Sequence, residues 1–137
     1  EERVRNIYKI LPKMDFFLPD VNEAEAITYT KNDVLMAKKL INLGASNVLI
    51  KEGSRGCLLA VRDYVKLIPS FKVNAINTTG AGDVFHAAFL KYILAGKEIE
   101  EAVRFANAAA ALATTKIGMD RYPKEKQVNE FLQSLHY

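Results

Sequence analysis

A glycine turn at the start of an apolar helix is the sequence feature that most constrains this chain. Residues 72–83 read Lys-Val-Asn-Ala-Ile-Asn-Thr-Thr-Gly-Ala-Gly-Asp, which predicts a short strand, a tight turn and a helix over residues 82–94. The first N–H groups of a helix have no partner inside it, and its dipole favours negative charge there. The small residues Gly80, Ala81 and Gly82 let an anion such as phosphate approach those groups. Beside them, Asp83 is suited to accept a proton from an attacking hydroxyl.

The same turn also has an interpretation without chemistry. The glycines then serve only the turn, and Asp83 is a first-turn acid that complements the helix dipole. Short glycine motifs match by chance, so spacing alone leaves both interpretations open.

Composition narrows the class of protein. Of 137 residues, 50% are hydrophobic and 26% are charged, which fits one globular domain over residues 1–137. The 19 basic and 16 acidic residues are well mixed, so we expect no nucleic-acid partner. No membrane-length apolar run or signal peptide is present, and Cys57 is the only cysteine. We therefore expect a cytoplasmic protein, not bound to a membrane, with Cys57 as a buried, reduced thiol.

The hydrophobic periodicity predicts alternating helices and strands. The expected class is α/β, with three α/β/α layers around a mainly parallel sheet. A hairpin or meander of short strands is appended to that sheet. The expected helices cover residues 2–11, 32–43, 82–94, 99–115 and 124–135, and an extended turn over residues 19–26 passes into a further helix. The expected strands cover residues 14–18, 47–51, 57–62 and 64–68. The helix over residues 82–94 is apolar on nearly all sides, so we expect it to be central.

Polar residues at the ends of these elements are further candidates for a site. Asn22 and Glu25 lie three apart, which fits a capping box with Asn22 as N-cap. It also fits a ligand site at the carboxyl end of a strand. Asn107 lies amid alanines and needs a partner if buried; an adenine edge and a backbone carbonyl are the alternatives. His86 and His136 have no neighbours suited to a shared metal site, so we expect no direct chemistry from either.

The segment Asn77-Thr78-Thr79-Gly80-Ala81-Gly82-Asp83 resembles the D-T-x-G-A-G-D signature of the ribokinase-like carbohydrate kinases. Asn22-x-x-Glu25 is similar to the N-x-x-E motif of that family. The segments Lys51–Gly56 and Ala106–Thr115 resemble its nucleotide-binding regions. Members are about twice as long, and this chain opens without an initiator methionine. The resemblance therefore implies a ribokinase-like, Rossmann-type fold, of which this chain is the C-terminal half.

The resemblance implies an ATP-dependent kinase that phosphorylates a hydroxyl of a sugar or nucleoside. Asp83 is then the general base, and the amides of Gly80, Ala81 and Gly82 form the anion hole. ATP is expected to bind at Lys51, Gly53, Gly56, Thr79 and Asn107, together with Asn22 and Glu25, which help to place Mg²⁺, largely through water. Two alternatives stay open from the residues alone: Lys51 as a solvated strand end, and a tight hairpin as the reason for Gly53 and Gly56. Members form homodimers mostly through the first half of the enzyme.

Two departures from the family pattern stand out. Asn77 replaces the usual Asp, which is among the groups around a K⁺ ion in some members, so any monovalent cation site should be weakened. Ala88 replaces a usual glycine. The alternatives to a kinase are a nucleotide- or phosphate-binding fragment, a pseudokinase without catalysis of its own, and a purely structural α/β module.

Overall fold

The computed structural model describes residues 1–135 and divides them into two compact units. The first unit contains residues 1–53 and 57–68, and the second contains residues 54–56 and the chain from Pro69 onward. The prediction of a single domain stays a prediction, because compact units of this kind can belong to one domain. His136 lies outside the described residues. No helix among residues 1–135 has the length and apolar character needed to cross a membrane.

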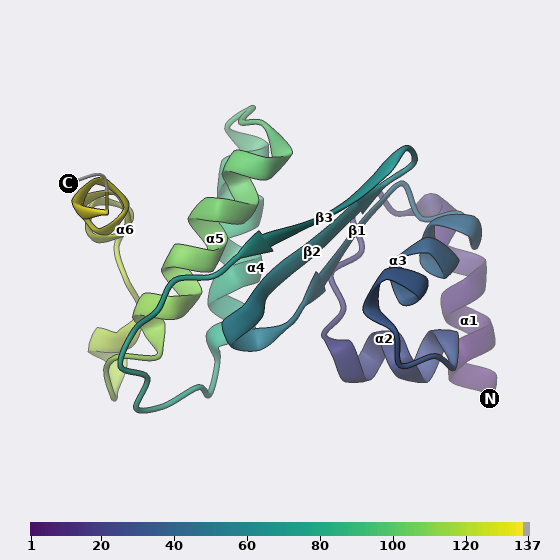
Figure 1. The fold of residues 1–137 in the computed structure, drawn as a ribbon, viewed down its shortest axis with the longest axis horizontal. Coiled ribbons are helices and arrows are strands. Elements are labelled where there is room, and N and C mark those ends of the chain that lie inside the picture. The colour runs from purple at the N-terminus through teal and green to yellow at the C-terminus, as the bar shows by residue number, and fades with distance from the viewer. Residues whose placement is uncertain (136–137) are drawn as a thin grey trace. The chain divides into compact units, whose positions relative to one another are not determined.

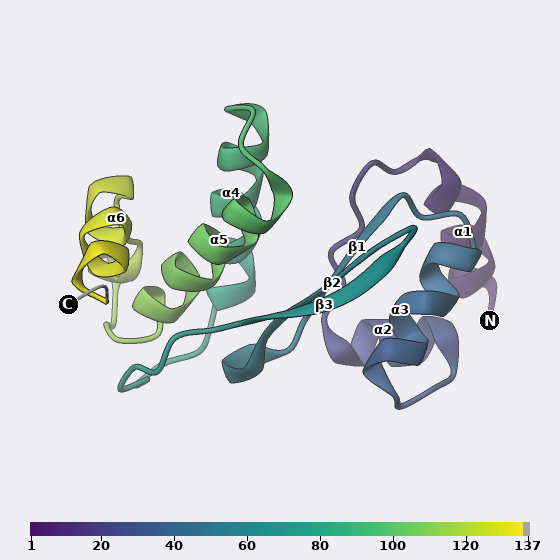
Figure 2. The same cartoon turned by 45° about the horizontal axis from the view of Figure 1, so that its top comes forward.

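The first unit packs two of its three helices against a small sheet, and the remaining helix contacts one of these two (Figures 1 and 2). The helices are α1 (Glu2–Ile10), α2 (Val21–Thr28) and α3 (Asp33–Asn42), and a 3₁₀ turn covers Leu11–Lys13. The strands are β1 (Asn47–Lys51), β2 (Gly56–Val61) and β3 (Tyr64–Pro69), in the order β1-β2-β3. Alternate residues of the strands face the helices, and these join apolar side chains of α2 and α3 in one core: Val48, Ile50, Leu58, Ala60, Ala24, Ile27, Met36, Ala37 and Leu40.

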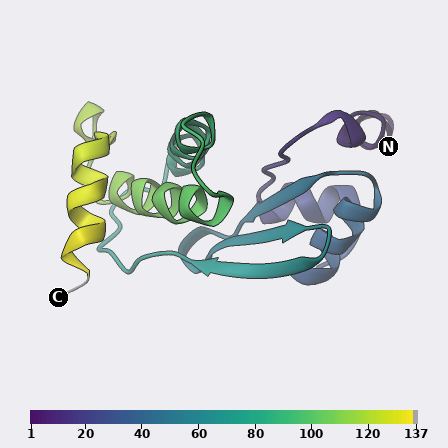
Figure 3. The ribbon, with the colours of Figure 1, turned by 90° about the horizontal axis from the view of Figure 1, so that it is seen from above.

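The prediction of a mainly parallel sheet is wrong for the described chain. β1 and β2 are antiparallel, with Leu49 opposite Leu59, and only Arg62 and Asp63 connect β2 to β3 (Figure 3). Connections this short can join only antiparallel neighbours, because a parallel crossover needs a dozen or more residues. The appended hairpin is therefore the whole of the sheet formed by named strands, and the α/β class itself is confirmed.

The segment predicted as a strand over residues 14–18 begins a short stretch that pairs in parallel with β1. Phe17 pairs with Val48 and Asp20 with Lys51 as isolated parallel bridges. The Phe17 N–H donates to the Asn47 carbonyl at 2.9 Å, and the Leu49 N–H donates to the Phe17 carbonyl at 2.8 Å. Helices α2 and α3 form the long connection between these two segments, as parallel pairing requires.

The second unit is built on the antiparallel helix pair α4 (Ala81–Leu94) and α5 (Ile99–Ala113) (Figure 1). Tyr92 of α4 stacks on Phe105 of α5, with ring centroids 3.8 Å apart. Helix α6 (Glu125–Ser134) adds Val128 to the same core as Phe105, Ala108 and Ala109. The alanines of α5 thus allow close helix packing.

Two expectations for the second unit are wrong. Residues 72–76 form no strand, because their backbone makes no sheet ladder among the described residues. Helix α4 is not central: only Phe85 and Phe89 are buried, while Leu90 and Leu94 are 54% and 77% exposed. A helix with apolar residues on all sides is buried only where neighbours cover every side, and the described chain covers α4 incompletely.

Candidate functional site

The turn before α4 has the geometry of an anion-binding helix start. Gly80 is the N-cap, with φ +81° and ψ 0°, a left-handed conformation that favours glycine. The Val84 N–H donates to the Gly80 carbonyl at 3.1 Å, which closes the first helical turn. Among residues 1–135, the N–H groups of Gly80, Gly82 and Asp83 have no hydrogen-bond acceptor. Three donors are therefore available to an anion at this helix start.

One predicted donor is used differently in the structure. The Ala81 N–H donates to the Thr78 carbonyl at 3.2 Å, so it closes the turn in this structure, and its part in an anion hole stays a prediction. The amide of Asp83 takes its place among the free donors. Sequence reasoning considered only the carboxylate of Asp83, although any third residue of a helix has an unpaired N–H as well.

The turn is anchored to the end of α5. The N–H groups of Ile76 and Asn77 both donate to the Thr114 carbonyl, at 2.8 and 3.1 Å. The Asn77 side-chain oxygen accepts a hydrogen bond from the Thr79 N–H at 3.0 Å. These bonds hold the segment that precedes Gly80, and the last carbonyls of a helix, such as that of Thr114, are free to accept them.

The carboxylate of Asp83 is available for proton transfer. Asp83 is the third residue of α4 and is exposed. Among the described residues, its side chain takes part in no hydrogen bond or ion pair. A general base must reach the proton of its substrate, and nothing in the described part of the chain occupies this carboxylate.

The capping-box interpretation of Asn22 and Glu25 is wrong. Helix α2 has Asp20 as its N-cap: Asp20 Oδ1 accepts from the Glu23 N–H, and Glu23 Oε2 accepts from the Asp20 N–H, both at 2.8 Å. The capping box thus lies two residues earlier than predicted. The side chains of Asn22 and Glu25 make no hydrogen bond to any of residues 1–135, so their oxygen atoms are available as ligands. Asn22 is exposed and Glu25 is partly buried.

Lys51 ends β1 at the same edge of the sheet as the start of α2. The Lys51 N–H donates to the Pro19 carbonyl at 2.9 Å, and Lys51 pairs in parallel with Asp20. The structure therefore brings the predicted residues Asn22 and Lys51 to one edge, the carboxyl ends of two parallel segments. Ligands of open α/β sheets bind at such ends.

The two glycines after β1 lie in a tight connection. Gly53 begins a 3₁₀ turn over Gly53–Arg55 with φ +58°, and a Cβ atom there would meet nothing within 4 Å. Gly56 is the buried first residue of β2, with φ +113°. Positive φ angles favour glycine, so the backbone conformation alone explains why glycine occupies both positions. Contact of Gly53 and Gly56 with a nucleotide stays a prediction.

Asn107 is buried in the middle of α5, with 3% of its surface exposed. Its Nδ2 group donates to the Pro69 carbonyl at 3.3 Å. Of the two partners considered, the structure shows the backbone carbonyl. A nucleotide-binding role for Asn107 stays a prediction.

Two further residues considered in the sequence are Cys57 and His86. Cys57 is a free, buried thiol, and burial, assisted by the nearby Glu52 carboxylate, raises its pKa from 9.0 to about 12. This confirms the prediction of a core cysteine. His86 is exposed on α4. Residues 1–135 contain no group of three His, Cys, Asp or Glu side chains arranged to hold a metal ion.

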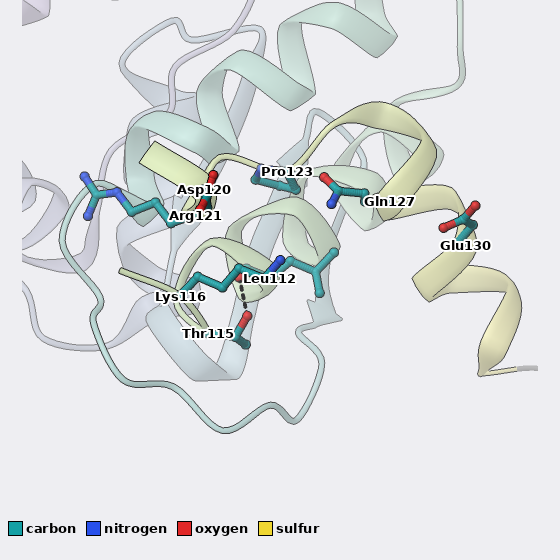
Figure 4. A pocket seen from close by; sticks show the side chains of 8 residues that line it. All are labelled: Leu112, Thr115, Lys116, Asp120, Arg121, Pro123, Gln127 and Glu130. Atoms are coloured by element: carbon teal, nitrogen blue, oxygen red, sulfur yellow. Dashed lines mark hydrogen bonds between the residues drawn. The ribbon is translucent and has the colours of Figure 1, made fainter. Parts of the chain in front are cut away.

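A shallow cavity of about 190 Å³ lies between the end of α5 and α6 (Figure 4). Its walls include the apolar Leu112 and Pro123 and charged residues of both signs: Lys116, Arg121, Asp120 and Glu130. No predicted site residue lines this cavity. It is also smaller than the roughly 300–1,000 Å³ of typical ligand pockets, so we do not assign the nucleotide to it.

The site of this α/β chain is thus a glycine turn with free amides followed by an exposed carboxylate, a geometry suited to binding an anion. The sequence matches the pfkB family carbohydrate kinases over residues 3–126, and the chain belongs to this family. A deoxyribokinase of Salmonella typhi is 35% identical over 126 residues, which cover 88% of this chain and 41% of the relative.

Solved structures agree with this assignment. Ribokinase from Thermotoga maritima has a TM-score of 0.86 and 38% identity, and the match covers 92% of this chain and 44% of that protein. Arabidopsis thaliana ribokinase, solved with ribose and ATP, has a TM-score of 0.85 and 30% identity over 92% of this chain and 43% of its own.

The chain thus spans about two fifths of the length of these relatives. These matches give the share of the relatives' length that the chain covers and not its position within them. The prediction that the chain is their C-terminal half is therefore not confirmed.

Proposed function

We propose that this chain provides the phosphate-binding turn and the general base of an ATP-dependent kinase that phosphorylates a sugar or nucleoside hydroxyl. The single observation that carries the proposal is the start of α4, where free amides of Gly80, Gly82 and Asp83 adjoin the exposed Asp83 carboxylate. Membership in a carbohydrate kinase family and the likeness to a ribokinase solved with ribose and ATP support it.

The residues of the turn fit a triphosphate. Gly80 has no side chain and adopts a left-handed conformation, so its peptide group can approach a ligand closely. Amide donors at a helix start stabilise negative charge on phosphoryl oxygens without reorganising during the reaction. Bound ATP would supply the phosphoryl group. Thr79 lies beside these donors, and Lys51, Gly53, Gly56 and Asn107 are the further nucleotide contacts that we propose.

The chain's own carboxylate then completes the reaction. The acceptor hydroxyl would lose its proton to Asp83 as its oxygen forms the new bond to the γ-phosphorus, while the bond from that phosphorus to the β,γ-bridging oxygen breaks and ADP leaves with its electron pair. The amides hold the charge that develops on the transferred group, which is what phosphoryl transfer mainly requires. Asn22 and Glu25 offer oxygen atoms of the kind Mg²⁺ prefers, and we propose that they hold the ion through water. Asn77 is neutral, and its side-chain oxygen already accepts from Thr79, so we propose only a weak monovalent cation site.

The test is Asp83→Asn in the complete protein, with ribose and deoxyribose first in the acceptor panel. Loss of one general base should lower kcat by about 10²–10⁴, while ATP affinity measured by calorimetry should change little. Glu101→Gln is the matched control, because it also removes a charge from the first turn of a helix. Near-normal turnover of Asp83→Asn would refute the role of Asp83. If the wild-type protein binds ATP but transfers no phosphoryl group to any acceptor in the panel, it is a pseudokinase.

A further inference from the structure

Arg121 makes a long-range contact with the phosphate-binding turn. It ends the 3₁₀ turn Met119–Arg121, and its Nη1 group donates to the Thr79 carbonyl at 2.7 Å. Figure 4 shows its side chain extending away from the other residues that line the cavity. The two residues are 42 positions apart in the sequence. A fully charged donor makes this bond stronger than one between neutral groups.

The guanidinium is held in place by its neighbour. Its Nη2 group donates to the Tyr122 hydroxyl at 2.9 Å, and its central carbon lies 4.9 Å from the centre of the Tyr122 ring. Both contacts are favourable, since a guanidinium stacks on aromatic rings and presents several donors in one rigid plane. Arg121 therefore approaches Thr79 in a defined orientation.

The bonded carbonyl controls the direction of an anion donor. The Thr79 carbonyl and the Gly80 N–H belong to one peptide group, and the described chain contains no cis peptide bond. In a trans peptide group the C=O and N–H bonds point in opposite directions. A guanidinium that holds the Thr79 oxygen on one side thus turns the Gly80 N–H to the other side, and that N–H has no acceptor among residues 1–135.

The other turn bonds do not fix this peptide group. The Thr79 N–H bond to Asn77 and the Ala81 N–H bond to Thr78 engage the peptide groups on either side. Arg121 also approaches Gly80 directly, because a Cβ atom there would lie 3.1 Å from Nη2. No other group of the described chain bonds to the Thr79 carbonyl.

We propose that Arg121 is a positioning residue of the phosphate-binding turn: its guanidinium holds the Thr79 carbonyl and thereby aims the Gly80 N–H at a phosphoryl oxygen. This inference rests on the proposed kinase function, which it deepens by adding a residue outside the glycine motif. Arg121 acts through the backbone of Thr79 and Gly80 and need not touch the substrate.

The test compares Arg121→Ala and Arg121→Lys with the wild type in the complete protein. A misplacement of about 1 Å can cost up to about 10²-fold in rate, so we expect Arg121→Ala to lower kcat/KM for ATP by about 10- to 100-fold. The KM of the acceptor should stay unchanged. Arg121→Lys should recover only part of the loss, because an ammonium group keeps the charge but lacks the planar fork.

Chemical rescue separates positioning from general destabilisation. Guanidinium chloride at non-denaturing concentration should restore part of the rate of Arg121→Ala, and tetramethylammonium chloride at equal ionic strength should not. Arg104→Ala is the matched control, because Arg104 lies over the Phe71 ring, 5.1 Å from its centre. Its loss removes an equal charge, and its rate should stay near wild type without a response to guanidinium.

The inference and the proposed function fail in different ways. Wild-type kcat/KM in Arg121→Ala, or a loss that guanidinium does not restore, would overturn the inference and leave the kinase function standing. A wild-type protein without phosphoryl transfer would overturn the kinase function. In that case calorimetry decides the inference: weaker ATP binding by Arg121→Ala would support it, and equal binding would overturn it.

Discussion

Replacing Gly80 with alanine should weaken phosphate binding at the turn in addition to lowering the stability of the fold. Gly80 has φ +81°, and an added Cβ atom would lie 3.1 Å from Arg121 Nη2. An alanine in this left-handed conformation costs about 1–2 kcal/mol. That loss alone changes the ratio of folded to unfolded protein by about 5- to 30-fold.

The effect on the site adds to this cost. Relief of the crowding requires a shift either of the Arg121 guanidinium or of the Gly80 peptide group, and both belong to the arrangement that aims the Gly80 N–H. A hydrogen bond to a charged group contributes about 1.5–3 kcal/mol. Loss of one such bond to phosphate should therefore weaken ATP binding by about 10- to 100-fold.

Gly96 offers a matched control in the same unit. It follows the C-terminal end of α4 with φ +78°, and a Cβ atom there would meet nothing within 4 Å. Gly96→Ala should thus cost a similar 1–2 kcal/mol without touching the turn. Urea denaturation gives the stability of both variants, and calorimetric titration with ATP gives their affinity.

The comparison can refute the reasoning in two ways. Wild-type ATP affinity in Gly80→Ala would show that the Gly80 peptide group does not take part in phosphate binding. An equal loss of affinity in both variants would show that the effect comes from lowered stability and not from the turn.

The remaining predictions concern the first unit. Burial and Glu52 hold the pKa of Cys57 at about 12 against an ordinary 9.0, so iodoacetamide at pH 8 should label it only after unfolding; rapid labelling of the folded protein would contradict this. The unfolded chain loses the thiol proton near pH 9, and the folded chain loses it near pH 12. The free energy of unfolding should therefore be unaffected by this group below pH 9 and should fall as the pH rises from 9 toward 12. Asp20→Ala removes the observed N-cap of α2 and should cost about 0.5–2 kcal/mol in urea denaturation. Asn22→Ala should leave stability nearly unchanged and weaken binding of Mg²⁺–ATP, and the reverse pattern would restore Asn22 as the cap.

Several features could be predicted from short stretches of sequence. The helix start at Gly80, the capped helix after Asn32 and the buried strand Asn47–Lys51 all depend on neighbours within a few residues. Backbone hydrogen bonding, glycine conformation and hydrophobic period act at that range. The sequence also indicated the correct family, because the glycine motif and the Asp83 carboxylate form one continuous segment.

The predicted cap of α2 was wrong because two neighbouring pairs of residues can each form a capping box. Asn22 and Asp20 can both cap α2, and Glu25 and Glu23 can both complete the box. The structure selects Asp20 and Glu23, where the Asp20–Lys51 pairing ends the extended segment. The choice therefore depends on strand β1, about 30 residues later in the chain.

The chain's own order of residues determines that a helix begins at Gly80 with unpaired amides and an acid in its first turn, since those properties follow from the backbone near that point. How the turn is held, and where the Gly80 amide points, was decided by contacts from Thr114 and Arg121. Residues so far apart in the sequence meet only after α4, α5 and the segment behind them have packed. No local pattern encodes the direction of a peptide group that a distant guanidinium holds.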